Sequence, residues 1–368
     1  MIRRLSRPSN MVTMAGAALL AMAIALPANA QKKTRVSVGV TETVGAYNPH
    51  SDSVALMYAV WCQTYGCLGS WNFSKAADVG MLTDSWEVKD PNTWVFKLKK
   101  NLRRHDNKAE LTAADVVHSI ERIRTDKRSS QTQNVKKIKS ATAIDKYTVE
   151  IKTHKPTAPL LAYTFDRVMI TSKELFEKHG ARNADRKHHF GYGPYRLKRL
   201  KTGESVIIEK NPYWPGVKKE WPDEVIFRIM REPEQRVTAL LNGEIQIAQF
   251  VPPHLLDKVR KSKNARIEAM GSVELMMLLM NPAFPPWDNV KMRKAVAHAI
   301  DRDTLIKHVL KGEAIKLTGP IGPLQFGYSK NVKPTYEYNP EKARQLVKEA
   351  GYPNGIDVEL STPVGRYV

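Results

Sequence analysis

The sequence predicts an α/β protein built from open sheets that helices cover. Short stretches alternate between apolar and polar residues, as in 35–40, where Val36, Val38 and Val40 share one face. This period of two is typical of half-buried strands. Between such stretches lie apolar stripes of helical period, bounded by capping residues, proline and glycine. Neither low-complexity linkers nor a fixed repeat interrupts the alternation.

The expected elements follow one another along most of the chain. Thr112 and Asp115 form a capping box before a helix whose inner face carries Val116, Ile120 and Ile123. Further helices are expected from Pro233 to Gly243, over 292–300, from 305 to Gly312, and from Asn339-Pro340 to Gly351. The expected strands are 35–40, 94–99, 147–153, 205–210, 225–230 and 357–361.

The first thirty residues predict an export signal. A basic start with Arg3, Arg4 and Arg7 precedes an apolar run over 11–26, and Ala28-Asn29-Ala30 supplies the small-x-small cleavage pattern. We therefore expect cleavage before Gln31 after secretion by the general route, because the residues after Arg3-Arg4 fit a twin-arginine signal poorly. A retained anchor is the alternative, but the apolar run is shorter than the ~20 residues that a spanning helix needs.

Size and charge limit the further possibilities. Removal of the first thirty residues leaves 338 of the 368. A chain of this length is too long for a single ordinary hydrophobic core, so we expect two or three lobes. Lysine and arginine outnumber aspartate and glutamate by 58 to 37, which gives a formal charge of +21. The densest basic runs lack a nucleic-acid-binding motif, so we expect a generally basic surface and no nucleic-acid partner. These runs are 97–104, 136–139 and 258–263.

The cysteine and histidine patterns do not indicate a metal site. Cys62 and Cys67 are the two cysteines of an exported chain, where disulfides persist. A helix over 55–66 would place them about 7.5 Å apart along its axis, beyond the ~7 Å reach of a disulfide. Pairing therefore requires a break near Gly66, and the sequence leaves it open. For the histidines of the polar run 178–189, we expect a solvated loop rather than a metal site, because nothing shows that they converge. They are His179, His188 and His189.

Eight motifs in order resemble one family. They are Tyr47-Asn48-Pro49-His50, 82–99 (LTDSWEVKDPNTWVFKLK), 111–117 (LTAADVV), 191–195 (GYGPY), 211–214 (NPYW), 240–247 (LLNGEIQI), 281–300 and 338–355. Together they resemble solute-binding protein family 5, the extracellular proteins that include the dipeptide-, oligopeptide- and nickel-binding components of ATP-binding-cassette importers. Three departures concern turn or edge positions: Asp106-Asn107 for Asp-Gly, Tyr192 for threonine and Gln246 for aspartate.

The resemblance implies a periplasmic-binding-protein-like fold of the cluster C type, with two lobes of open mixed sheets and an extra subdomain. It places lobe I at 31–70 with 186–270, the extra subdomain at 71–185, and an incomplete second ligand-binding lobe at 271–368, with 275–281 crossing the hinge. In the family, the chain continues where this sequence stops. The sequence therefore resembles a truncated product. We expect the chain as given to be poorly soluble or partly unfolded beyond about Gly271, and to bind solute weakly or not at all.

The resemblance also implies what the chain does and where. It implies a periplasmic, monomeric receptor that closes its lobes around a small solute, most simply a short peptide, and delivers it to a membrane permease and ATPase. It implies neither a catalytic residue nor a cofactor nor a metal. The cleft residues that it implies are Asp52, Ser53, Val54, Ala55, Gln249 and Phe250, for which ordinary surface or hinge loops are the alternative reading.

Two other functions stay open from the sequence. A periplasmic hydrolase would also be exported and two-lobed, but the chain lacks G-x-S-x-G, H-E-x-x-H and S-x-x-K followed by K-T-G. A truncated receptor without function is the third reading. An assay for turnover of peptides and esters separates the enzyme from the binding protein.

Overall fold

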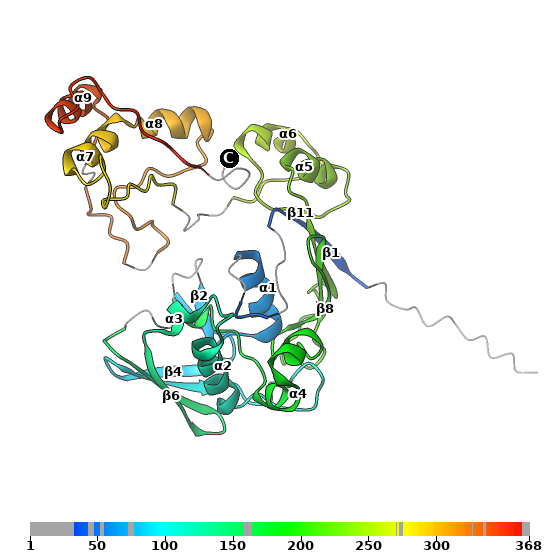
Figure 1. Cartoon of the computed structure of the whole chain (residues 1–368). Coiled ribbons are helices and arrows are strands. Elements are labelled where there is room, and N and C mark those ends of the chain that lie inside the picture. Colours follow the sequence, from blue (N-terminus) through cyan, green and yellow to red (C-terminus); the bar gives the residue numbers. More distant parts are fainter. Residues whose placement is uncertain are drawn as a thin grey trace, which may run out of the picture. The chain divides into compact units, whose positions relative to one another are not determined.

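The structure is a computed structural model, shown in Figure 1. It describes residues 33–42, 48–51, 55–72, 77–157, 160, 164–269, 271, 275–325, 327–333 and 336–362. Met1–Lys33 and Thr34–Val368 are separate units. The expected export signal and its cleavage site before Gln31 lie outside the described residues. In the described part of the chain, no helix has both the length and the apolar character that crossing a membrane requires.

Strands and helices alternate along the described chain, as expected from the sequence. The strands are β1 (Arg35–Val40), β2 (Gly69–Asn72), β3 (Ala77–Gly80), β4 (Thr83–Asp90), β5 (Thr93–Leu98), β6 (Ile138–Asp145), β7 (Thr148–Thr153), β8 (Tyr195–Lys201), β9 (Ser205–Lys210), β10 (Glu224–Ile229) and β11 (Ile247–Ala248). The helices are α1 (Ala55–Tyr65), α2 (Ala113–Thr125), α3 (Thr132–Val135), α4 (Lys173–Arg186), α5 (Pro233–Leu241), η2 (Pro253–Leu255), α6 (Leu256–Arg260), α7 (Val290–Ala299), α8 (Arg302–Thr304), the π-helical turn η3 (Leu305–Val309) and α9 (Pro340–Glu349).

A mixed five-stranded sheet has the order β11-β1-β10-β9-β8. β1 is parallel to both of its neighbours, whereas β10, β9 and β8 pair antiparallel. The apolar helix α1 packs beside β8 (Figure 1), and its residues Met57, Val60 and Trp61 are buried with Val206 and Ile208 of β9. This core explains why α1 has no polar face.

A second, antiparallel sheet has the order β4-β5-β7-β6, and α2 packs against β6 and β7 (Figure 1). The expected capping box is present, with Thr112 and Asp115 bonded reciprocally at the start of α2. Val116, Ile120 and Ile123 are fully buried. Burial of each such side chain contributes about 1.5–3 kcal/mol, so this face is sufficient to dock the helix.

Two expectations about local structure are wrong. The run 178–189 is not a loop, because its residues up to Arg186 belong to α4, which begins at the Ser172 cap and contains a kink at Gly180. The stretch 357–361 is extended but is not a strand, because no described strand pairs with it. A ladder needs a partner, and an alternating pattern alone does not provide one.

The region from residue 275 onward contains helices rather than a described sheet. α7 packs against α9, with Met292, Ala295, Ala343 and Leu346 buried between them. In contrast, the extended stretches 276–279 and 356–360 expose apolar side chains, with Leu279 87% and Leu360 71% exposed. The expectation that this region is poorly soluble stays a prediction, as do the proposed domain boundaries.

Candidate ligand-binding site

The topology of the five-stranded sheet brings three loops to one edge. Because β1 is parallel to β10 and β11, the residues after Val40, Ile229 and Ala248 all leave the sheet at the same edge. Ligands of open α/β sheets bind in the crevice outside the carboxyl ends of such strands. The chain after β1 and the chain after β11 are the two loops for which the sequence predicts cleft residues.

A buried arginine of α5 joins two of these loops. The guanidinium of Arg236 donates through Nε to the Gln249 carbonyl and through Nη2 to the Phe250 carbonyl, both at 2.8 Å. Its Nη1 donates to the carbonyls of Met230 at 2.6 Å and Arg231 at 3.2 Å. Burial lowers the pKa of Arg236, and neighbouring glutamates partly offset this effect. Arg236 therefore fixes the backbone that follows β10 and β11.

Gly39 of β1 makes room for this arginine. A Cβ atom at position 39 would lie 2.7 Å from Ile245 Cδ1 and 2.9 Å from Arg236 Cγ, which is closer than real Cβ contacts. The Gly39 carbonyl also accepts a hydrogen bond from the Gln249 backbone N–H at 2.9 Å. The small residue on β1 thus allows the loop after β11 to lie directly against the strand.

Gln249 and Phe250 both present side chains at this edge. Phe250 has a positive φ of 53° and a side chain that is 54% exposed. Gln249 is half-buried, and its side-chain Oε1 is buried without a hydrogen-bond partner in the described part of the chain. Buried amide oxygens normally have a donor, so this atom is an acceptor that a ligand N–H can satisfy when the side chain turns toward the edge.

The start of α1 lies beside the chain that follows β1. Glu42, two residues after β1, accepts a hydrogen bond from the Leu56 backbone N–H at 2.8 Å. A carboxylate at this position caps the first turn and complements the positive end of the helix. Ala55, the first residue of α1, is thereby placed next to the same edge. The other predicted residues of this loop, Asp52, Ser53 and Val54, lie outside the described residues.

The end of α1 is fixed by the GYGPY motif. The backbone N–H groups of Tyr192 and Gly193 donate to the carbonyls of Tyr65 and Thr64 at 3.0 and 2.9 Å. His105 accepts from the Gly191 N–H through Nδ1 at 3.1 Å, and its Nε2 is 3.2 Å from the Gly193 carbonyl. This pairing requires the neutral Nε2–H form of the ring. Burial lowers the pKa of His105 to about 3, which is consistent with that form.

The sequence departures are accommodated locally. Asn107 stands at a φ of 58°, a left-handed conformation that asparagine tolerates better than most residues other than glycine. Gln246 places its Oε1 2.9 Å from the Ser37 backbone N–H, where an aspartate oxygen would also accept. Tyr192 is buried, and burial raises the pKa of its hydroxyl. None of the three therefore disturbs the sheet.

Two other places in the chain do not belong to this edge. A cavity of about 790 Å³ lies on the antiparallel sheet and contains none of the predicted site residues; its lining includes Lys97, Lys99, Tyr147 and Trp214. The rings of His179 and His188 stack 3.8 Å apart. No group of three or more histidine, cysteine, aspartate or glutamate side chains in the described ranges converges as a metal site would require.

The sequence pointed to the loop after β11, which stays a prediction, but not to the residues that organise the edge. Arg236 and Glu42 are common polar residues in sequence, and no motif distinguishes them. The sequence offers one signal for Arg236. It lies four residues before Leu240, so both residues share one face of the helix, and an arginine on an apolar face is expected to be buried and paired.

Comparison with known proteins places the chain in a family. The model of the bacterial extracellular solute-binding proteins, family 5 (Middle), matches residues 79–366. The chain belongs to this family.

Two curated relatives and one solved structure match most of the chain. The dipeptide-binding protein of Escherichia coli (strain K12) is 28% identical over 95% of this chain and 69% of its own length. The glutathione-binding protein GsiB of Escherichia coli O1:K1 / APEC is 31% identical over 94% of this chain and 67% of its own length. The periplasmic binding protein DppA from Helicobacter pylori, in complex with peptide STSA, superposes with a TM-score of 0.77 at 27% identity, over 88% of this chain and 68% of its own.

These matches confirm the expected fold class, with open mixed sheets typical of family 5 binding proteins. They also confirm that the chain is of the solute-binding type found in ATP-binding-cassette import. The chain spans about two thirds of the length of these relatives.

Proposed function

We propose that the chain binds short peptides in the periplasm and delivers them to the permease and ATPase of an importer, without chemical change to the peptide. The observation that supports this most directly is the edge at the carboxyl ends of β1, β10 and β11, where the side-chain oxygen of Gln249 has no donor among the described residues and Phe250 has an exposed ring.

The chemistry of this edge suits a peptide. An extended peptide carries alternating N–H and C=O groups, and the buried Oε1 of Gln249 gains a partner when a peptide N–H donates to it. The Phe250 ring offers apolar area for a peptide side chain. The names of the relatives support the same class, since they describe proteins that bind a dipeptide, glutathione and a four-residue peptide.

The remaining parts of the proposal follow from the sequence. We infer that cleavage before Gln31 produces the mature chain and that it acts as a monomer. Asp52, Ser53, Val54 and Ala55 line the cleft beside the β11 loop in this proposal. The second lobe after Gly271 supplies the opposing surface, so closure around the peptide depends on contacts from both lobes.

Calorimetric titration of the mature chain with di-, tri- and tetrapeptides tests the proposal. We expect Phe250→Ala to weaken binding about tenfold, because loss of a packed aromatic ring costs about 1.5 kcal/mol. Tyr213→Ala is the matched control: Tyr213 is 40% exposed but follows β9, which runs antiparallel to β10 and ends at the opposite edge.

Several results would contradict the proposal. Equal peptide affinity of wild type and Phe250→Ala would show that Phe250 does not contact the peptide. Failure of every peptide to bind, while another solute such as a metal chelate binds, would refute the peptide class. Mass spectrometry of the bound peptide should return it intact, whereas cleavage products would show an enzyme.

A further inference from the structure

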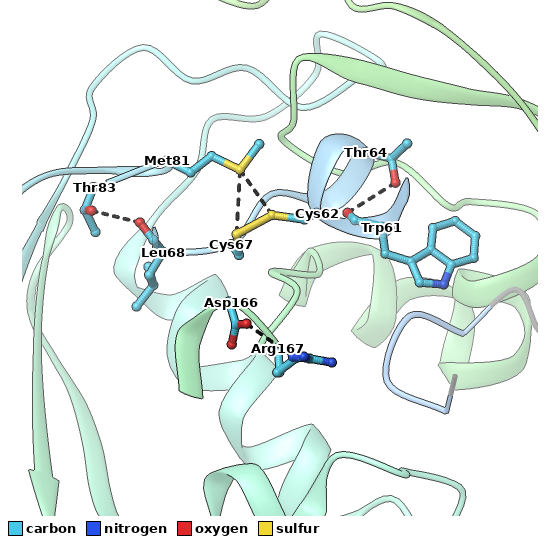
Figure 2. Close-up of a disulfide and its surroundings, with 9 residues drawn as sticks. All are labelled: Trp61, Cys62, Thr64, Cys67, Leu68, Met81, Thr83, Asp166 and Arg167. Atoms are coloured by element: carbon cyan, nitrogen blue, oxygen red, sulfur yellow. Dashed lines mark hydrogen bonds and ion pairs between the residues drawn. A yellow bond between two sulfur atoms is a disulfide. The ribbon is translucent and has the colours of Figure 1, made fainter. Parts of the chain in front are cut away.

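Three sulfur atoms meet where α1 ends and the β2–β3 hairpin begins. Cys62 and Cys67 form a disulfide, which is possible because α1 ends at Tyr65 and Gly66 turns the chain with a φ of 82°. The Sδ atom of Met81 lies 3.5 Å from Cys62 Sγ and 3.7 Å from Cys67 Sγ, as Figure 2 shows. The condition for pairing that the sequence set, a break near Gly66, is thus met.

The backbone around these sulfurs is fixed independently of the S–S bond. The N–H of Leu82 donates to the Cys67 carbonyl at 3.1 Å, and the N–H of Met81 donates to the Leu68 carbonyl at 3.0 Å. Cys67 also forms an antiparallel bridge with Met169. The Gly66 N–H donates to the Cys62 carbonyl at 3.0 Å. Reduction of the disulfide therefore leaves the three side chains attached to the same rigid frame.

Two of the three residues are partly accessible, and a lysine ammonium group lies beside one of them. Cys67 is fully buried, whereas Cys62 and Met81 are half-buried. The ammonium group of Lys99 donates to the Met81 backbone carbonyl at 2.9 Å. The half-buried Cys62 and Met81 are the residues past which a small ion would have to enter, and the Lys99 ammonium beside Met81 would partly offset the negative charge of two thiolates.

The sulfur spacing fits a particular class of ion. Three sulfurs bound at about 2.3 Å in a plane lie about 4 Å from one another, so the two Met81 distances need to increase only slightly. The Cys62 and Cys67 sulfurs must separate to the same spacing once their bond is broken, which side-chain rotation allows with the two Cα atoms 5.6 Å apart. Thiolate and thioether ligands select soft ions such as Cu(I). Zinc instead prefers four ligands, and the described residues provide no group of three His, Cys, Asp or Glu side chains that would add them here.

We propose that, after reduction, Cys62, Cys67 and Met81 bind one Cu(I) ion through three sulfurs. A dithiol reductant transfers two electrons and two protons to the Cys62–Cys67 bond and is itself oxidised to a disulfide. Binding of Cu(I) then releases both thiol protons to solvent, which leaves two thiolates and the Met81 thioether on the ion. The oxidised protein binds no copper at this place, so the disulfide and the metal exclude each other.

The test uses the mature chain, reduced with a phosphine, desalted without oxygen and titrated with Cu(I) against a chromogenic Cu(I) chelator. We expect wild type to withdraw one equivalent from the chelator, and the oxidised protein to withdraw none. Met81→Leu should bind at least about tenfold more weakly, whereas Met276→Leu, a methionine that is 69% exposed elsewhere, should bind as wild type does. X-ray absorption should show three sulfurs at about 2.3 Å.

Four outcomes would overturn the proposal. The first is that reduced wild type does not compete with the chelator. The second is that Met81→Leu binds as tightly as wild type, because the thioether would then not be a ligand. The third is that the two thiols become reducible only when circular dichroism shows that the fold is lost. Cys62→Ser with Cys67→Ser should abolish binding, and copper retained by that variant would also refute the site.

Discussion

Replacement of Arg236 by alanine tests whether one side chain organises the candidate ligand edge. The substitution removes the donors from four backbone carbonyls, those of Met230, Arg231, Gln249 and Phe250. It also leaves an empty space beside Gly39, because the Arg236 side chain is 1% exposed and packs against that glycine.

The expected loss of stability follows from how accessible these acceptors are. The Met230 carbonyl is buried, and leaving it unpaired costs about 1–3 kcal/mol. Water can partly replace the guanidinium at the other three, at about 0.5 kcal/mol each. We therefore expect the free energy of unfolding to fall by about 3 kcal/mol, or the melting temperature by about 4 °C for a chain of this length. Arg236→Lys keeps the charge but not the planar fork, and should lose about half as much.

Calorimetry measures the loss, and hydrogen exchange locates it. The N–H of Met230, bonded to the Val40 carbonyl, and the N–H of Gln249, bonded to the Gly39 carbonyl, should exchange faster in Arg236→Ala. Amides of the antiparallel sheet β4–β7 should be unchanged. A loss below about 1 kcal/mol, or equal exchange at both amides, would refute the argument that Arg236 fixes this edge.

Two further predictions concern the GYGPY motif. Gly193→Ala would place a Cβ 2.2 Å from the Gln63 carbonyl oxygen, a backbone atom that cannot easily move. We expect the free energy of unfolding to fall by more than about 3 kcal/mol, or no folded protein to form, as measured by thermal unfolding. A variant as stable as wild type would contradict this packing. His105 has a pKa of about 3 in the folded chain, below the ~6.5 of an unfolded one, so its contribution is complete above pH ~6.5 and is lost as the pH falls toward 3. His105→Gln should therefore reduce the slope of the unfolding free energy against pH by about 1.4 kcal/mol per pH unit in this range. Asp115, Asp166 and Asp185, whose pKa values burial raises, contribute slopes of the opposite sign, but they do so equally in both proteins. Identical slopes in wild type and variant would contradict the neutral ring.

The elements that the sequence predicted correctly are those whose signals are local. The capping box at Thr112, the proline at 233 and the glycine at 351 determine helix ends through contacts within a few residues. α1 and α4 gave weaker signals for opposite reasons: α1 is buried among apolar neighbours and has no polar face, and α4 is polar with a glycine inside. The stretch 357–361 shows the converse error, since its alternation resembles a strand but no described strand pairs with it.

For the candidate site too, local sequence signals were readable, whereas contacts between distant segments were not. The resemblance predicts the loop with Gln249 and Phe250 because its motif is contiguous in sequence. The role of Arg236 depends on four carbonyls that come together only when β10, β11 and α5 are placed. The proximity of Met81 to the two cysteines likewise depends on the pairing of the chain around β2 and β3, which no spacing rule reveals.

The antiparallel bridge between Cys67 and Met169 has a consequence for modularity. Residues paired in this way lie about 5 Å apart, so the chain between them leaves and returns at nearly the same point. That excursion carries most of one hydrophobic core, which includes Phe96, Ile120 and Phe165 and to which Ile170 and Tyr192 also contribute. Segments whose ends are adjacent can be gained, lost or exchanged by recombination with little entropy of closure. The excursion between Cys67 and Met169 is thus the place where a related chain can acquire a different accessory module while its five-stranded sheet stays unchanged.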